Sequence, residues 1–372
     1  MRLLIERSEL FRALSHVASV VERRTTIPIL SNVLLRATET GASFKGTDLE
    51  REVIETVAAD VGQPGAVTIQ AHLLHDIVRK LADGAQITLD SAGGGERLQL
   101  TCGHSKFQLP ALAADEFPDI GAGEMPHEFE LPAHELRRLI EKARFAISTE
   151  ETRYYLNGIY LHVAQVGPET MLRAVATDGH RLAQIQTIAP KGAAGMPGVI
   201  VPRKTVNEVH KLLEGNEGDV KVALSTTRIQ FRTPQVVMTS KLIDGTFPDY
   251  QRVIPQGNNK VMNVANAEFA NAVDRVATVS TERGRAVKLA IERDKLVLSV
   301  VNPDGGSATE EIPVDYDADK LEIGFNARYL LDIAGQLESP TVRFFLSDSG
   351  SPTTVRDESD EHALYVLMPM RV

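Results

Sequence analysis

Apolar side chains recur at helical spacing in segments far apart along the chain. Three such segments open with polar residues and then place apolar side chains three or four positions apart, as Leu10, Leu14 and Val17 do in the first. Three other segments share an acid, then a branched apolar residue, then a leucine. Together they predict six amphipathic helices, at 8–20, 72–82, 133–147, 203–214, 267–279 and 326–337.

Alternating, β-branched stretches lie between these segments and predict strands. They are 65–70, 85–90, 97–102 and 106–112 in the first third, 220–225, 228–233 and 236–242 in the second, and 295–301, 321–326 and 341–347 in the last. Glycine-containing turns separate them, at Asp83-Gly84, Gly93 to Gly95, Asp244-Gly245 and Asp304-Gly305.

The order of these elements repeats three times. The first two thirds end alike, in "EFPDI" at 116–120 and "TFPDY" at 246–250. Two matched helices per third and a shared tail favour three copies of one domain over chance similarity. We predict domains at 1–122, 128–254 and 255–372.

Composition indicates a globular cytoplasmic protein. The 372 residues are 43% hydrophobic and 24% charged. No apolar run approaches the roughly 18 residues of a membrane span, and the charged amino-terminal residues indicate no signal peptide. Cys102 is the only cysteine, which excludes an intrachain disulfide and a cysteine-based zinc cage. We predict no metal and no cofactor.

The net charge of −10 argues at first against a nucleic-acid partner. The charge is uneven, however. The six predicted helices carry 12 basic and 9 acidic residues, so the rest of the chain holds 28 basic and 41 acidic residues. Two interpretations stay open, an ordinary solvated face on each helix or helices that line a surface facing a polyanion. The basic helix faces are formed by nine of the twelve basic residues, Arg79, Lys80, Arg137, Arg138, Lys142, Arg144, Arg203, Lys204 and Lys211.

The segment "ATDGHRLA" (176–183) suggests a catalytic site, because an aspartate, a histidine and an arginine lie within four positions. Thr177-Asp178 recurs as Thr47-Asp48, one repeat of 130 residues earlier, with no histidine after it. That recurrence favours a structural turn, in which the aspartate bonds its own backbone. His180 and Arg181 have no counterpart in this comparison, so an enzyme hypothesis depends on one histidine without a nucleophile motif.

Several longer stretches, in their order and spacing, resemble the bacterial β sliding clamp family, the processivity subunits of DNA polymerase III. The resemblance covers nearly the full length and is carried by "IPILSNVLL" (27–35), "GTDLE" (46–50), "RYYLNGIYL" (153–161), "ATDGHRLA" (176–183), "VPRK" (201–204), "SKLIDGTFPDYQRVIP" (240–255) and "YVLMPMRV" (365–372). It implies an α+β fold of three repeated clamp domains, each with two helices backed by antiparallel sheets. It also implies a head-to-tail homodimeric ring around duplex DNA.

The resemblance further implies a non-catalytic protein that docks the short linear motifs of polymerases, the clamp loader and repair proteins. These would bind in a pocket between the second and third domains. The implied pocket residues are Leu156, Thr177, Gly179, His180, Arg181, Leu182, Pro248, Arg252, Val253, Val366, Met368, Pro369, Met370 and Arg371. Leucine, valine and methionine suit an adaptable apolar groove, and Arg and His suit its rim.

The family's DNA-contacting positions fall on Arg24, Tyr154 and Tyr155, and the basic pair Arg203 and Lys204 is added from the charge pattern. Two further positions hold His72 and Glu150, in place of an arginine and a glutamine, so we do not extend DNA contact to them. The expected ring seam joins the strand 106–112 to the segment 277–284. Its candidate residues are Phe107, Leu109, Thr278 and Val279.

Three hypotheses therefore stand. The chain is a ring that tethers polymerases to DNA, an enzyme centred on Asp178 and His180, or an acidic scaffold that never touches DNA.

Overall fold

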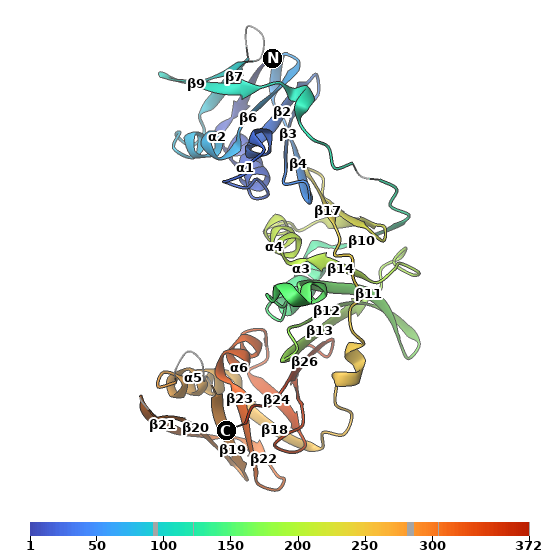
Figure 1. The fold of residues 1–372 in the computed structure, drawn as a ribbon, viewed down its shortest axis with the longest axis vertical. Helices are drawn as coiled ribbons and strands as arrows, with labels where there is room; N and C mark the ends of the chain where they lie inside the picture. The colour runs from blue at the N-terminus through green and yellow to red at the C-terminus, as the bar shows by residue number, and fades with distance from the viewer. Residues whose placement is uncertain (92–95, 122, 281–285, 304, 372) are drawn as a thin grey trace. The chain divides into compact units, whose positions relative to one another are not determined.

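The computed structural model describes residues 1–91, 96–121, 123–280, 286–303 and 305–371 (Figure 1). Two of the predicted turns, at 93–95 and at Asp304, lie outside these residues. The chain divides into two compact units. Unit 1 comprises Met1–Leu136, Pro190–Pro197 and Lys204–Leu242, and unit 2 comprises Arg137–Ala189, Gly198–Arg203 and Ile243–Val372. This division passes through the predicted middle domain, so the predicted domain boundaries stay predictions.

All six predicted helices are present in the described residues. They are α1 (Arg7–Ala18), α2 (Ala71–Arg79), α3 (Ala133–Arg144), α4 (Arg203–Leu212), α5 (Asn266–Ala277) and α6 (Ala327–Ala334). Each ends two or three residues before its predicted end. The predicted helices were too long because apolar residues after each helix end keep the helical spacing in a tighter final turn. After α2, Leu81 N donates to Val78 O at 3.2 Å, and after α6, Leu337 N donates to Ala334 O at 3.3 Å.

The buried helix faces repeat as the sequence predicted. In three helices the apolar residues are spaced 3, 4 and 7 positions from the first, which forms one stripe facing a sheet. These are Leu10, Ala13, Leu14 and Val17 in α1, Leu136, Leu139, Ile140 and Ala143 in α3, and Phe269, Ala272, Val273 and Val276 in α5. Short 3-10 helices also occur, namely η1 (Pro28–Ser31), η2 (Ala114–Glu116), η3 (Glu151–Leu156) and η4 (Tyr250–Val253).

One antiparallel sheet forms the framework of unit 1. Its order in the described residues is β10-β15-β16-β17-β4-β3-β2-β6-β9-β8-β7-β1-β5. The strands are β1 (Arg2–Glu6), β2 (Asn32–Thr38), β3 (Gly41–Thr47), β4 (Arg51–Val57), β5 (Asp60–Gln63), β6 (Gly65–Gln70), β7 (Gln86–Asp90), β8 (Arg97–Cys102), β9 (Ser105–Leu112), β10 (His127–Pro132), β15 (Asp219–Leu224), β16 (Arg228–Arg232) and β17 (Val236–Lys241).

Unit 2 contains two antiparallel sheets, ordered β14-β11-β12-β13-β26-β25-β24-β18-β22 and β21-β20-β19-β23 in the described residues. The first holds β11 (Gly158–Val166), β12 (Glu169–Thr177), β13 (Arg181–Ile188), β14 (Val199–Pro202), β18 (Lys260–Ala265), β22 (Asp315–Tyr316), β24 (Thr341–Leu346), β25 (Thr353–Asp357) and β26 (Ala363–Leu367). The second holds β19 (Ala286–Glu292), β20 (Lys295–Asn302), β21 (Gly306–Pro313) and β23 (Leu321–Asn326).

The ten predicted strands are thus confirmed, and the two units share a plan. In unit 1, β10-β15-β16-β17 continue through the antiparallel pair β17–β4 into β3-β2-β6. In unit 2, β18-β24-β25-β26 continue through the antiparallel pair β26–β13 into β12-β11-β14. Each unit therefore joins two half-sheets at one central strand pair. No helix in the described part of the chain is long and apolar enough to cross a membrane.

Candidate functional site

The turn between β12 and β13 holds the residues that suggested catalysis. Thr177 Oγ1 donates to Arg181 O at 2.6 Å and accepts from Gly179 N at 3.1 Å. Asp178 Oδ1 accepts from His180 N at 2.9 Å and from Arg181 N at 3.0 Å. Gly179 has a φ of 89°, which an L side chain rarely adopts. The predicted structural role of the Thr-Asp pair is confirmed.

Arg181 is buried, and its side chain links this turn to neighbouring segments through hydrogen bonds. Its Nε donates to Asp178 Oδ2 at 3.1 Å, its Nη2 donates to Phe145 O at 2.7 Å, and its Nη1 binds Asp332 of α6. The guanidinium also stacks over the Tyr329 ring, 4.3 Å from its centroid. Arg181 also lines the hollow described below, but the donors of its guanidinium are directed at these protein partners.

The prediction that Arg181 has no counterpart in the repeats is wrong. Arg51 occupies the same place in the turn between β3 and β4, where Asp48 Oδ1 accepts from Arg51 N at 2.7 Å and Asp48 Oδ2 from Arg51 Nε at 3.1 Å. Thr47 Oγ1 donates to Arg51 O at 2.7 Å. Of the two residues said to lack a counterpart, His180 does differ from the residue at its place in the first turn, which is Glu50. The exposed His180 ring stacks on Tyr329 with centroids 6.3 Å apart, and within the described residues no hydrogen bond joins it to a nucleophile.

A mainly apolar hollow of about 200 Å³ lies beside this turn, wholly within unit 2. We call it the unit 2 pocket. Its lining residues are Leu156, Thr177, Gly179, Arg181, Leu182, Pro248, Asp249, Tyr250, Val253, Val366 and Met368. Beneath it a buried cluster joins β12, β13, β14 and β26 through Val175, Leu182, Ile200 and Val366. Exposed Val253 and Met368 edge a pocket with an apolar floor.

The structure places nine of the fourteen sequence-derived pocket residues in this lining. Of the others, His180 lies in the turn, Arg252 is exposed and pairs with Asp249 at 2.8 Å, and Met370 N donates to Gly324 O at 2.8 Å. Pro369 and Arg371 follow the last strand outside the lining. Sequence reasoning missed Asp249 and Tyr250, although both belong to the recurring "FPD" tail that had been noticed.

Tyr250 is held in place from behind the pocket. Arg173 Nη1 donates to its hydroxyl oxygen at 3.3 Å, and the hydroxyl lies 3.0 Å from His162 Nε2. His162 Nδ1 lies 3.1 Å from Val163 O. Burial lowers the pKa of His162, so the imidazole is neutral near pH 7. A neutral ring that donates through Nδ1 accepts a hydrogen bond from the tyrosine hydroxyl at Nε2.

None of the residues predicted to contact DNA belongs to the described lining of the unit 2 pocket. Arg24, Arg203 and Lys204 are exposed, and Lys204 Nζ lies 3.4 Å from Glu22. Tyr154 is 53% exposed and packs edge-on against Tyr155, which itself contacts the pocket's core cluster. Both tyrosines lie in η3 rather than at the start of a strand.

Two basic helix residues cannot serve a polyanion. Lys142 Nζ binds Asp360 at 3.0 Å and Glu338 at 2.8 Å, and Arg138 binds Asp360 at 2.8 Å. The charge pattern could not distinguish such internal pairs from a surface. The two positions to which DNA contact was not extended, His72 and Glu150, also have partners within the protein. His72 Nε2 lies 2.9 Å from Val21 O, and the Arg153 guanidinium beside Glu150 lowers the pKa of that carboxyl.

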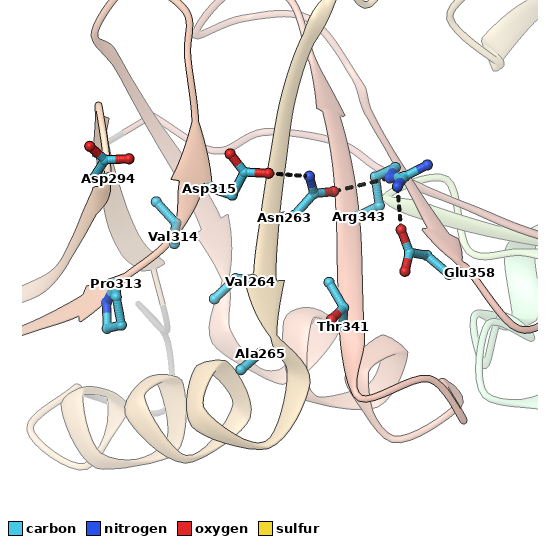
Figure 2. Close-up of a pocket in the computed structure, with 10 residues that line it drawn as sticks. All are labelled: Asn263, Val264, Ala265, Asp294, Pro313, Val314, Asp315, Thr341, Arg343 and Glu358. Carbon is cyan, nitrogen blue, oxygen red and sulfur yellow. Dashed lines mark hydrogen bonds and ion pairs between the residues drawn. The ribbon is translucent and has the colours of Figure 1, made fainter.

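A second hollow, of about 630 Å³, lies across β18, β22 and β24 (Figure 2). Its wall is a ladder of polar side chains. Asn263 Nδ2 donates to Asp315 at 3.0 Å, Arg343 Nε donates to Asn263 Oδ1 at 3.0 Å, and Arg343 also binds Glu358. Because these side chains satisfy one another around an open space, the hollow does not match an apolar ligand as the unit 2 pocket does.

Comparison with known proteins defines the class. Residues 1–121, 130–249 and 251–371 match the models of the N-terminal, central and C-terminal domains of the DNA polymerase III beta subunit. A beta sliding clamp of Caulobacter vibrioides is 52% identical, and one of Escherichia coli is 38% identical, each over all of both chains. A DnaN sliding clamp of Bartonella birtlesii bound to griselimycin superposes with a TM-score of 0.97 at 51% identity, again over all of both chains.

The chain belongs to the DNA polymerase III beta subunit family, the beta sliding clamps. The three repeated clamp domains predicted from the sequence are thereby confirmed. Members of this family are non-catalytic accessory subunits of the polymerase, so the hypothesis of an enzyme centred on Asp178 and His180 is wrong.

Proposed function

We propose that two copies of this chain close head to tail into a ring that encircles duplex DNA and slides along it in the cytoplasm, on the nucleoid. Topology rather than tight contact would hold the DNA, which suits an acidic chain. The observation that carries the proposal is the full-length match of all three domains to DNA polymerase III beta subunits.

Two free strand edges support ring closure. Over residues 105–110, β9 pairs with β8 alone, and β21 pairs with β20 alone, among the strands of the described residues. An unpaired edge offers a row of backbone donors and acceptors to another chain. Phe107 and the buried Leu109 of β9 would meet Thr278 and Val279, which follow the end of α5, in the partner chain.

The unit 2 pocket would dock short linear motifs of the polymerase catalytic subunit, the clamp loader, other polymerases and repair proteins. Its apolar floor of Leu182 and Val366 suits aliphatic or aromatic side chains of a peptide. Met368 at the edge gives the adaptability that several partners require. The Bartonella relative is bound to griselimycin, and we propose that griselimycin also binds the unit 2 pocket of this chain and can serve as its probe.

The DNA contacts would be made to phosphates, without reading sequence, by Arg24, Tyr154, Tyr155, Arg203 and Lys204. Such contacts weaken steeply with salt, so a few of them permit sliding.

Retention on DNA tests the ring directly. The protein is loaded onto nicked circular plasmid, the plasmid is cut at one site, and the fraction still bound is measured by gel filtration. Encirclement predicts retention on the circle and loss from the linear form. Equal retention on both would contradict it, as would a native mass of a single chain. Crosslinking at Arg24 that is unchanged by DNA would instead support the acidic scaffold.

A further inference from the structure

The central strand pair of unit 1 reproduces the one beneath the unit 2 pocket. Glu52 pairs with Thr239 across β4 and β17, as Leu182 pairs with Val366 across β13 and β26. Lys241 N donates to Glu50 O at 2.9 Å, and Met368 N donates to His180 O at the same distance. The two frames therefore match residue by residue.

The same match identifies the counterparts of the apolar cluster beneath the pocket. Leu34 of β2 and Tyr160 of β11 occupy matching positions in the two units. Lys45 pairs with Leu34 and Val175 pairs with Tyr160, so the strand register aligns Lys45 with Val175. It likewise aligns Thr68 with Ile200. The four strand residues of the apolar cluster, Val175, Leu182, Ile200 and Val366, thus correspond to four polar residues of unit 1. We call these the polar counterpart: Lys45, Glu52, Thr68 and Thr239.

The polar counterpart is internally satisfied. Lys45 Nζ lies 2.7 Å from Glu52 Oε2 and 3.4 Å from Asp119, and the Lys45 and Glu52 side chains are 12% and 7% exposed. Thr68 accepts from Asn32 Nδ2 at 3.0 Å, and Thr239 accepts from Gln230 Nε2 at 3.0 Å. Where unit 2 has the apolar Val175, unit 1 has the side chain of Lys45 with its ammonium group. An apolar ligand here would desolvate a near-buried ion pair without replacing its bonds.

We propose that the polar counterpart keeps this second frame closed to peptides, so that Lys45 and Glu52 limit each chain to one peptide site. The inference rests on the proposed function of the unit 2 pocket. It assigns specificity to a few strand residues rather than to the fold, because the backbone that could form a second pocket is already present.

The test exchanges the side chains of the two frames in the full-length protein. One variant carries Lys45→Val, Glu52→Leu, Thr68→Ile and Thr239→Val. A reciprocal variant carries Val175→Lys and Leu182→Glu. Lys45→Arg, which retains the ion pair, is the matched control. Isothermal titration with griselimycin gives the number of sites per chain, and thermal unfolding verifies that each variant is folded.

The unsubstituted chain and Lys45→Arg should each bind one griselimycin per chain, and the fourfold variant should bind two. The reciprocal variant should show no detectable site, because its affinity for griselimycin should fall at least about a hundredfold. A folded fourfold variant with one site overturns the inference alone. If that variant does not fold, a reciprocal variant that binds normally overturns it. If the unsubstituted chain binds no griselimycin, the proposed function of the pocket fails first.

Discussion

The turns Thr47–Arg51 and Thr177–Arg181 share their hydrogen bonds but differ in their surroundings. In unit 1, Arg51 pairs with Asp48 of its own turn at close range. In unit 2, Arg181 also reaches Asp332 and the Tyr329 ring, both in α6. One turn therefore closes a hairpin, whereas the other also fastens a helix beside the pocket. The comparison teaches that Thr, Asp and Arg define the frame, and that neighbouring side chains determine its use.

Removing the arginine from each turn should give the largest contrast. Arg181→Ala leaves Asp178 and Asp332 without their buried partner and should lower the free energy of unfolding by about 3–5 kcal/mol. Arg51→Ala leaves only Asp48 and should cost about 2 kcal/mol. Both losses of unfolding free energy are measured by urea unfolding, with hydrogen exchange used to monitor each unit separately. Equal losses would show that the α6 contact contributes nothing.

The left-handed position of each turn should respond differently to substitution. Gly179→Ala forces a side chain into φ 89°, with Arg153 Nη1 2.6 Å from the added carbon, and should cost about 1–2 kcal/mol. Leu49 already has φ 71°, so Leu49→Gly relieves strain and should change stability by less than about 1 kcal/mol. Thermal unfolding compares them, and a loss at Leu49 as large as that at Gly179 would contradict the equivalence of the turns.

His162→Phe tests the support behind Tyr250, which unit 1 lacks because Ile120 of its "FPD" tail stands in the corresponding place. Loss of the 3.0 Å hydrogen bond should weaken griselimycin binding by about 1 kcal/mol, roughly fivefold. An unchanged affinity in titration would show that the tyrosine needs no such support.

The same histidine predicts a pH dependence. Burial lowers the pKa of His162, so the unfolded chain binds the proton more readily. Its contribution to stability is present above the unfolded value of about 6.5 and is lost as the pH falls through the lower folded pKa. Unfolding curves from pH 7.5 to 5 should show this loss in the unsubstituted protein and less of it in His162→Phe.

Arg252→Ala should have the smallest effect. The Arg252 side chain is 84% exposed and pairs with Asp249 at the surface. Exposed pairs contribute about 0–1 kcal/mol, so griselimycin affinity should change by no more than about threefold. A tenfold loss would place this residue among the ligand contacts, as the family resemblance implied.

The sequence predicted the helices and strands because their apolar periodicity is local. It placed helix ends two or three residues late because Leu81 and Leu337 keep the period through a tighter turn. It could not show that Lys142 forms an ion pair with Asp360, a partner 218 residues away in the sequence. Comparing "TDLER" with "TDGHR" to the last residue would have revealed the Arg51 counterpart. Tyr250 was within reach through the repeated tail.

Hydrogen exchange with and without saturating griselimycin tests most directly that the apolar frame, and not its polar counterpart, receives the ligand. We expect slower exchange in residues 175–182 and 366–368 of unit 2, with exchange in residues 45–52 and 239–241 of unit 1 unchanged. Equal protection of both frames, or protection of the unit 1 frame alone, would contradict this expectation.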